Sequence, residues 1–224
     1  MSSASLFNYL LLLLVLPVSA VWPAPQFITT GNTALWIEPN VKVTYNGRSI
    51  WNNHSPVSGQ NNEQVLDSGV SPDEADAAGT TISNQAIVER AVARSLDALF
   101  KKGLVPWKQH TRNALSKFEP YPGPKKAFVS SLDITQKSLQ QSYKSLAGDL
   151  DESYNLTISQ DGKAAIDAVS SFGVLHGLAT FIQLFYQHSV SGKGPYTPFA
   201  PVAIVDAPKF KHRGLNLVCN PSSS

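Results

Sequence analysis

Tyr154-Asn-Leu-Thr-Ile-Ser-Gln-Asp-Gly-Lys-Ala-Ala-Ile-Asp-Ala168 is the stretch that decides the fold of this 224-residue chain. In its first part the apolar residues Tyr154, Leu156 and Ile158 alternate with polar ones, which is typical of a strand with one buried face. Residues 160–163 contain an Asp-Gly turn dipeptide, and residues 164–168 are apolar except for Asp167. The stretch therefore predicts a β-hairpin.

Two amphipathic helices are predicted, one before and one after this hairpin. The first starts near Ser83, which suits an N-cap, and ends near Gly103, with Lys101 and Lys102 at its negative end. Its apolar residues recur at spacings of three and four: Val88, Ala91, Val92, Leu96, Leu99 and Phe100. The second helix is predicted from about Ser171 to Gln187, with a buried side formed by Leu175, Leu178, Ile182, Phe185 and Tyr186.

The rest of the chain predicts short strands and loops. Short strands separated by turns are expected within 26–30, 35–37, 41–45, 127–134 and 202–205. Residues 46–80 are rich in Asn, Ser, Gly, Asp and Ala and predict a long exposed loop, and residues 103–125 predict a proline-rich loop. Strands in succession with two helices between them predict an α+β fold, with the helices on one face of a sheet.

The N-terminus predicts a signal peptide over residues 1–20. A leucine-rich run, 10–16, precedes the small residues Val18-Ser-Ala20, so cleavage is expected after Ala20 and a mature start at Val21. The alternative is an uncleaved anchor. The sequons at Asn53 and Asn155 predict N-glycosylation on the same route. We expect a secreted protein, with delivery to a vacuole or lysosome as the alternative.

Composition excludes several classes of partner and site. The formal charge of +2 gives no basis for binding nucleic acid, and we expect membrane contact only through the signal peptide. The single cysteine, Cys219, has no partner within the chain. The five histidines show no metal-ligand spacing, and no phosphate-binding glycine loop occurs, so neither a metal nor a cofactor is predicted. The pair Lys101-Lys102 is read as surface or as a processing site.

The C-terminal part carries the candidate binding residue. After the strand at 202–205, an Asp206-Ala-Pro turn leads to His212-Arg213-Gly214. A guanidinium presents donors in a fixed fork that suits two vicinal sugar hydroxyls, and an ion-pairing arginine is the alternative. The acids Asp73, Glu74 and Asp76 are expected to be solvated in the long loop, and His176 to be a packed or surface residue.

Four segments in order resemble secreted eukaryotic β-N-acetylhexosaminidases of glycoside hydrolase family 20. They are Trp22-Pro-Ala-Pro-Gln26, Glu152-Ser-Tyr-Asn-Leu-Thr-Ile158, Phe172-Gly-Val-Leu-His-Gly-Leu-Ala-Thr-Phe-Ile-Gln-Leu184 and Asp206-Ala-Pro-Lys-Phe-Lys-His-Arg-Gly-Leu215. The resemblance covers residues 21–217. It departs from the family at Phe172, where tryptophan is common, and at His176, where arginine is frequent.

The resemblance implies a zincin-like N-terminal domain over residues 21–207, with an antiparallel sheet and two helices. In the family this domain packs beside a (β/α)8 catalytic barrel. Residues 208–217 would be the start of that barrel, and residues 218–224 an aberrant tail. Arg213 maps onto the family's arginine that binds hydroxyls of the non-reducing sugar.

The family's activity is the removal of terminal N-acetylglucosamine or N-acetylgalactosamine from chitin oligomers or glycans. Its catalytic Asp-Glu pair lies beyond the His-Arg-Gly segment: the glutamic acid protonates the leaving oxygen, and the aspartate orients the substrate's own acetamido nucleophile. The residues after Arg213 include no acid and are too few for a barrel of about 200 residues or more. We therefore expect no hydrolysis by this chain alone, and the missing barrel as its partner.

Three hypotheses follow for function. The first is a truncated hexosaminidase, whose natural partner is the barrel and whose substrate is an N-acetylhexosaminide or chitin oligosaccharide. The second is a stand-alone secreted module that binds a partner barrel or a glycan. The third is an unrelated α+β binding domain, which the four ordered segments disfavour.

Overall fold

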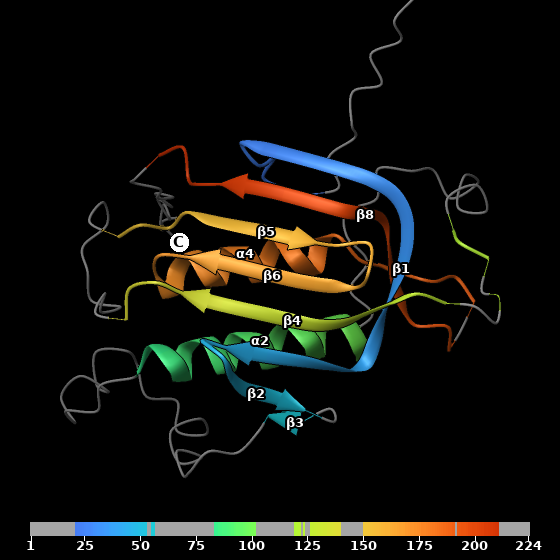
Figure 1. The fold of residues 1–224 in the computed structure, drawn as a ribbon, viewed down its shortest axis with the longest axis horizontal. Helices are drawn as coiled ribbons and strands as arrows, with labels where there is room; N and C mark the ends of the chain where they lie inside the picture. The colour runs from blue at the N-terminus through green and yellow to red at the C-terminus, as the bar shows by residue number, and fades with distance from the viewer. Residues whose placement is uncertain are drawn as a thin grey trace, which may run out of the picture.

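The computed structural model describes residues 21–52, 55–56, 83–101, 119–121, 123, 126–139, 150–190 and 192–210. Its elements form two layers, an eight-stranded sheet and two helices that both lie behind it in the view of Figure 1. The helices are α2 (Asn84–Phe100) and α4 (Ser171–Gln183). The strands are β1 (Phe27–Tyr45), β2 (Arg48–Asn52), β3 (Ser55–Pro56), β4 (Phe128–Gln136), β5 (Tyr154–Ile158), β6 (Lys163–Ala168), β7 (Tyr186–Gln187) and β8 (Pro195–Asp206). The predicted placement of both helices on one face is confirmed.

The sheet is mixed, so the prediction of an antiparallel sheet is wrong. Its order is β3-β2-β1-β4-β6-β5-β8-β7, with a further pairing of β1 with β8. Strand β4 runs parallel to both β1 and β6, while the other pairs are antiparallel. The reason lies in the predicted hairpin of β5 and β6, which inserts with its second strand next to β4. This placement makes β6 parallel to β4.

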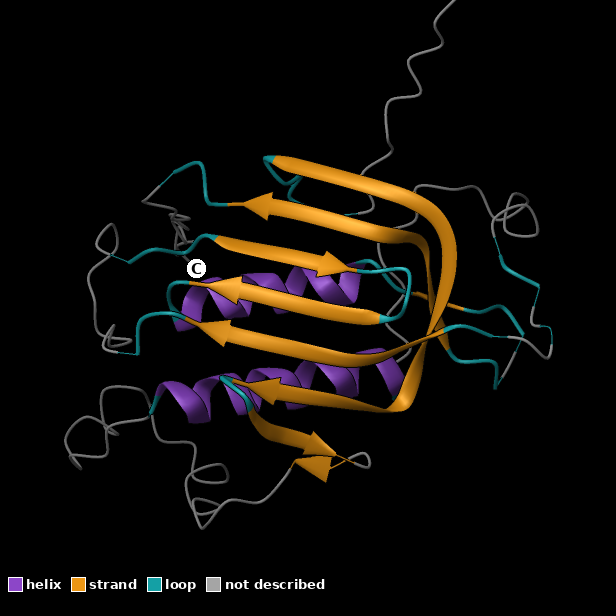
Figure 2. Ribbon diagram, viewed as in Figure 1, coloured by secondary structure: helices purple, strands orange, loops and turns teal. Residues whose placement is uncertain are grey.

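Strand β1 is one long bent strand where the sequence predicts several short ones. Its first half pairs with β8 and its second half with β4 and β2, so it follows one side of the sheet, turns, and continues beyond β4 (Figure 2). Trp36 lies at the bend and is paired with both Phe128 on β4 and Tyr196 on β8. The Gly, Asn and Pro residues taken as turns fall at register shifts within the strand. They bend the strand without ending it.

A hairpin also replaces the start of the predicted loop at 46–80. Asn46 and Gly47 both have positive φ, 48° and 79°, and they connect β1 to β2. An Asn-Gly dipeptide with both φ angles positive is the favoured two-residue hairpin turn. The loop prediction was wrong over residues 48–52 and 55–56, and residues 57–82 lie outside the described part of the chain.

The first helix confirms its prediction closely. The Ser83 side chain caps α2 by accepting a hydrogen bond from the Ala86 amide at 3.2 Å. Its predicted stripe faces the core, since Val88, Ala91, Val92, Leu96 and Leu99 are buried. Lys101 follows the last residue of α2 and forms an ion pair with Asp97 at 2.9 Å. The predicted capping residue Gly103 lies outside the described residues.

The second helix is shorter and is rotated from its prediction. It ends at Gln183, and Tyr186 begins the short strand β7. Val174, Leu178 and Phe181 are its fully buried apolar residues, whereas Leu175 and Ile182 are only partly buried. The face against the sheet includes Gly177, where a Cβ atom would lie 2.7 Å from Ile166 Cγ2. The predicted Leu178 and Phe185 are buried, whereas Leu175 and Ile182 lie at the margin, because part of the face against the sheet is glycine, which gives no hydrophobic signal in the sequence.

Candidate functional site at the exit from the sheet

A groove of about 790 Å³ lies where the chain leaves β8. One wall is the N-terminal segment, residues 22–26, and another is α4. The segment that follows β8, residues 207–210, completes the groove. This groove is the candidate functional site because it contains the turn, predicted at Asp206-Ala-Pro208, that leads toward Arg213.

The Asp206 carboxylate is the centre of a hydrogen-bond network at the groove. Its Oδ1 accepts from the Gln26 amide at 3.1 Å and from the Ala207 amide at 2.9 Å. Its Oδ2 accepts from the Tyr154 hydroxyl at 3.1 Å. One side chain thus joins the last residue of β8 to the N-terminal segment and to β5.

Tyr154 is the buried donor in this network. Its hydroxyl also lies 2.6 Å from the Thr180 hydroxyl on α4. Because a carboxylate only accepts, Tyr154 donates to Asp206, and Thr180 therefore donates to the Tyr154 oxygen. Burial raises the pKa of Tyr154 well above its ordinary value of 10, and the charge on Asp206 raises it further, against the lowering effect of the Thr180 hydrogen bond. Tyr154 is therefore a fixed proton donor at neutral pH.

The N-terminal segment is held to the groove by further polar contacts. The Gln26 side-chain amide donates to the Ala207 carbonyl at 2.9 Å. The Trp22 amide donates to the Gln183 Oε1 atom on α4 at 2.8 Å. Val21 is buried, while the Trp22 side chain is 79% exposed. The two ends of the described chain, residues 21–26 and 206–210, are thus joined to one another and to α4.

The acids near the groove are not arranged for proton transfer. Glu152 Oε2 lies 3.8 Å from His176 Nε2. The neighbouring Asp151 accepts hydrogen bonds from the hydroxyl and the amide of Ser153, at 2.6 Å and 2.9 Å. These bonds lower the pKa of Asp151, whereas a general acid at neutral pH needs a raised one. Asp151 therefore serves local structure.

A second polar cluster, at the opposite end of the sheet, is also structural. His188 is buried beside Trp36 and Tyr196, with ring centroids at 5.3 Å and 5.8 Å. Its Nδ1 accepts from the Val190 amide at 3.0 Å, so Nε2 carries the proton and donates to the Pro120 carbonyl at 3.2 Å. Lys126 lies over the Trp36 ring at 3.7 Å. Both ring nitrogens of His188 are occupied, which leaves neither for catalysis.

The predicted site residues have different outcomes. Arg213 and Asn53 lie outside the described residues, as do Cys219 and Lys102. Asn155 lies on β5 and is exposed, and its neighbours Tyr154 and Leu156 are buried, as the alternation predicts. Sequence reasoning missed the network of Gln26, Tyr154, Thr180 and Asp206. A tyrosine on the buried face at a strand end was the available signal, because a buried hydroxyl needs a hydrogen-bond partner.

Two features are absent from the part of the chain that the structure describes. Among those residues, His, Cys, Asp and Glu side chains form no group of three that would hold a metal ion. Neither α2 nor α4 has the length and apolar character needed to cross a membrane.

Comparison with known protein families and sequences gives a consistent result. Residues 21–184 match the family described as beta-acetyl hexosaminidase like. The chain is 36% identical over 209 residues to the beta-hexosaminidase of Arthroderma benhamiae, an alignment that covers 89% of this chain and 34% of that protein. It is 39% identical over 100 residues to the beta-hexosaminidase subunit beta of Mus musculus, which covers 45% of this chain and 17% of the mouse protein.

Solved structures were compared as well. The chitobiase of Flavobacterium johnsoniae is 22% identical with a TM-score of 0.43, covering 88% of this chain and 22% of that chain. The exo beta-N-acetylglucosaminidase of Vibrio harveyi is 14% identical with a TM-score of 0.42, covering 85% and 19%. The chain spans about a third of the length of the Arthroderma benhamiae protein.

Proposed function

Because this chain belongs to the family described as beta-acetyl hexosaminidase like, the N-terminal domain of glycoside hydrolase family 20 hexosaminidases, we propose that it is the non-catalytic part of a β-N-acetylhexosaminidase. The whole protein would remove terminal N-acetylglucosamine or N-acetylgalactosamine from glycans or chitin oligomers. In this proposal the domain positions the segment that carries Arg213, and its partner is the catalytic barrel.

The hydrogen-bond network of Asp206 carries the proposal. It fixes the point and direction at which the chain leaves β8, through the Gln26, Ala207 and Tyr154 donors. Arg213 follows seven positions later, and an extended chain of that length spans at most roughly 25 Å. A fixed exit point would therefore limit the distance of Arg213 from Asp206 to that reach.

The proposal assigns no catalytic step to the described residues. The carboxylate of Asp151 accepts hydrogen bonds from Ser153, which lower its pKa and favour its charged form, and the carboxylate of Asp206 accepts from three fixed donors. The acid and base of hydrolysis would belong to the barrel.

We further propose that the protein is secreted, with cleavage of residues 1–20 and delivery to a vacuole or lysosome as the alternative. Two observations support a domain that begins at Val21. Val21 is buried, and the amide of Trp22 donates to Gln183. N-terminal sequencing of protein from the medium of a eukaryotic culture tests this proposal, and a start upstream of Val21 would contradict it.

The domain role is tested by activity and by complementation. The purified chain is assayed with a chromogenic N-acetylglucosaminide, and it is then mixed with the part of the Arthroderma benhamiae protein outside the matched region. We expect no turnover by the chain alone, and a complex on size exclusion that Asp206→Ala weakens, because the variant loses the intrachain hydrogen bonds that fix the segment after β8. Asp161→Ala, at the exposed hairpin tip, is the matched control.

Each outcome separates the hypotheses. Turnover by the chain alone that Arg213→Ala abolishes would show that the domain is catalytic. A chain that binds a chitin oligosaccharide but no barrel would favour the stand-alone module.

A further inference from the structure

The face of the sheet opposite the helices is covered by no other described element (Figure 2). Much of this face is lined by small and polar side chains. The register places one row of them across six strand segments: Thr29, Ala203, Thr157, Ala165, Asp133 and Thr44. These side chains are exposed or partly exposed. We call this surface the open face.

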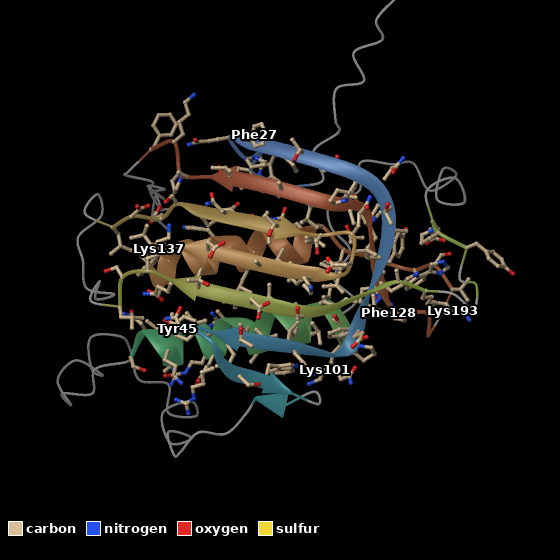
Figure 3. All side chains as sticks on the ribbon, viewed as in Figure 1. Phe27, Tyr45, Lys101, Phe128, Lys137 and Lys193 are labelled. Atoms are coloured by element: carbon tan, nitrogen blue, oxygen red, sulfur yellow. The ribbon has the colours of Figure 1, made fainter. Side chains whose placement is uncertain are left out.

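A second row on the open face contains an apolar pair beside a sequon. Phe27 on β1 pairs with Val205 on β8, which pairs with Asn155 on β5, which pairs with Asp167 on β6. Phe27 is 54% exposed and Val205 is 50% exposed. Figure 3 labels Phe27 at the outer edge of the sheet, at the start of β1. Two large apolar side chains thus lie exposed and adjacent, next to Asn155.

The sequon is presented on the same surface. Leu156 is fully buried, so Asn155 and Thr157 on either side of it both point to the open face, and both are exposed. Asn-X-Thr is the acceptor pattern for N-glycosylation. The buried X residue and the exposed Asn and Thr meet the need for a surface-accessible acceptor.

We propose that Asn155 carries an N-linked glycan whose first N-acetylglucosamine lies over Val205 and Phe27. The donor is an oligosaccharyl pyrophosphate on a lipid carrier. The Asn155 amide nitrogen forms a bond to C1 of the donor sugar and loses one proton, and the C1–oxygen bond to the lipid pyrophosphate breaks.

The position of the apolar pair sets the direction of the sugar. Neighbouring strands lie about 4.8 Å apart, so Val205 is one strand from Asn155 and Phe27 is two strands away, at roughly 10 Å. The C–H face and acetyl methyl group of the sugar gain by covering apolar area, and an aromatic ring is a favourable partner for them. On the other side of Asn155 lies the carboxylate of Asp167, which keeps its hydration if the sugar turns away. The distal sugars would then pass over β1 into solvent.

The test is a double-mutant cycle on the full chain, secreted from a eukaryotic host behind a standard cleavable leader. Intact mass before and after enzymatic release of glycans gives the occupancy of Asn155, with Asn155→Gln as the negative control and Asn53→Gln as the matched sequon variant. We expect Asn155→Gln to remove one glycan and to lower Tm by about 2–4 °C, the shift expected for a modest packing contribution in a domain of this size.

The double-mutant cycle distinguishes a glycan that packs on Phe27 and Val205 from one that is only attached at Asn155. In a Phe27→Ser background, Asn155→Gln is expected to lower Tm by less than half as much, and Val205→Thr provides a second background if Phe27→Ser is poorly expressed. Trimming the glycan to its first sugar is expected to retain the Tm of the intact glycoprotein. An unoccupied Asn155 overturns the proposal, as does an equal loss of Tm in all three backgrounds.

Discussion

At the scale of single residues, the buried phenol proton of Tyr154 helps to fix the direction in which the chain leaves β8. Tyr154 donates that proton to Asp206, and Thr180 donates to Tyr154, so the direction of the hydrogen bonds is fixed from α4 through β5 to β8. The Asp206 carboxylate accepts hydrogen bonds from the N-terminal segment, from the next amide in the chain and from a buried phenol. It therefore holds three parts of the chain in one arrangement. No single sequence pattern marks these residues, because they are brought together from positions up to 180 apart.

The raised pKa of Tyr154 predicts a loss of stability at alkaline pH. The unfolded chain ionises this phenol near its ordinary value of 10, while the folded chain keeps it protonated. Folded protein therefore binds the extra proton, and its stability is full below pH 10 and falls above it. Tyr154→Phe removes this effect, so the fall between pH 10 and 11 should be smaller by up to about 1.4 kcal/mol.

The measurement is urea unfolding at pH 8, 10 and 11. Tyr45, Tyr186 and Tyr196 also have raised pKa values through burial, so some alkaline loss remains in the variant. Tyr121→Phe is the control, because Tyr121 is 90% exposed. If the free energy of unfolding fell equally with pH in Tyr154→Phe and in wild type, the proton retained on Tyr154 would not be the cause of the alkaline loss.

At the scale of elements, both helices begin with a serine cap, yet the caps differ in burial. Ser83 is exposed and accepts a hydrogen bond from Ala86 at 3.2 Å. Ser170 is fully buried, accepts from the Gly173 amide at 3.2 Å and donates to the Asp151 carbonyl. The second cap thus joins the start of α4 to the segment that enters β5.

Loss of the two caps should differ in cost. Ser83→Ala should lower the free energy of unfolding by about 1 kcal/mol, since water replaces the serine oxygen. Ser170→Ala should lower it by about 2–3 kcal/mol, because the buried Gly173 amide and the partly buried Asp151 carbonyl both lose their partner. Urea denaturation with unchanged m-values would measure both changes. Equal losses would show that the Gly173 amide and the Asp151 carbonyl find other partners in the Ser170 variant.

The elements themselves were predictable to different degrees. The hairpin of β5 and β6, strand β4 and helix α2 follow from alternation, a turn dipeptide and a spacing of three and four, all of which are local signals. The continuity of β1 was not predictable in this way, because its Gly, Asn and Pro residues read as turns until β8 and β4 pair with them on either side. The end of α4 at Gln183 was not predictable from local signals either, because it depends on a distant contact. Tyr186 pairs with Tyr196 on β8, so the chain continues as a strand and not as a helix.

The candidate site was predicted only as a turn. Asp206-Ala-Pro208 was recognised from its residues, but the network around it depends on the N-terminal segment reaching the end of β8. The prediction for Arg213 stays a prediction, since that residue lies outside the described part of the chain.

At the scale of the whole molecule, β8 is the strand on which the sheet depends. It pairs with β5 on one side and with the first half of β1 on the other. Residues 21–184, which match the family, do not include it. A fragment that ends at Gln183 would leave both neighbours with unpaired backbone groups and expose the buried residues Leu156 and Leu35.

We therefore expect residues 21–183 not to fold cooperatively, whereas residues 21–210 should unfold in one transition. Circular dichroism during thermal unfolding, with amide proton dispersion by NMR, distinguishes the two. A dispersed spectrum and a sharp transition for the shorter fragment would contradict the role of β8.

The two halves of β1 also gain their partner strands at different times during synthesis. The second half meets β2 within a few residues, but the first half has no partner until the end of β8, and Gln26 and Asp206 are 180 positions apart. At 5–20 residues per second, the ribosome needs roughly 10–40 s to close that interval. During this wait the segment Phe27-Ile-Thr-Thr-Gly-Asn-Thr33 is an unpaired edge with no charge and no proline, a composition that favours pairing with other chains. The late pairing with β8 thus leaves the first half of β1 open to association with other chains until the last described strand emerges.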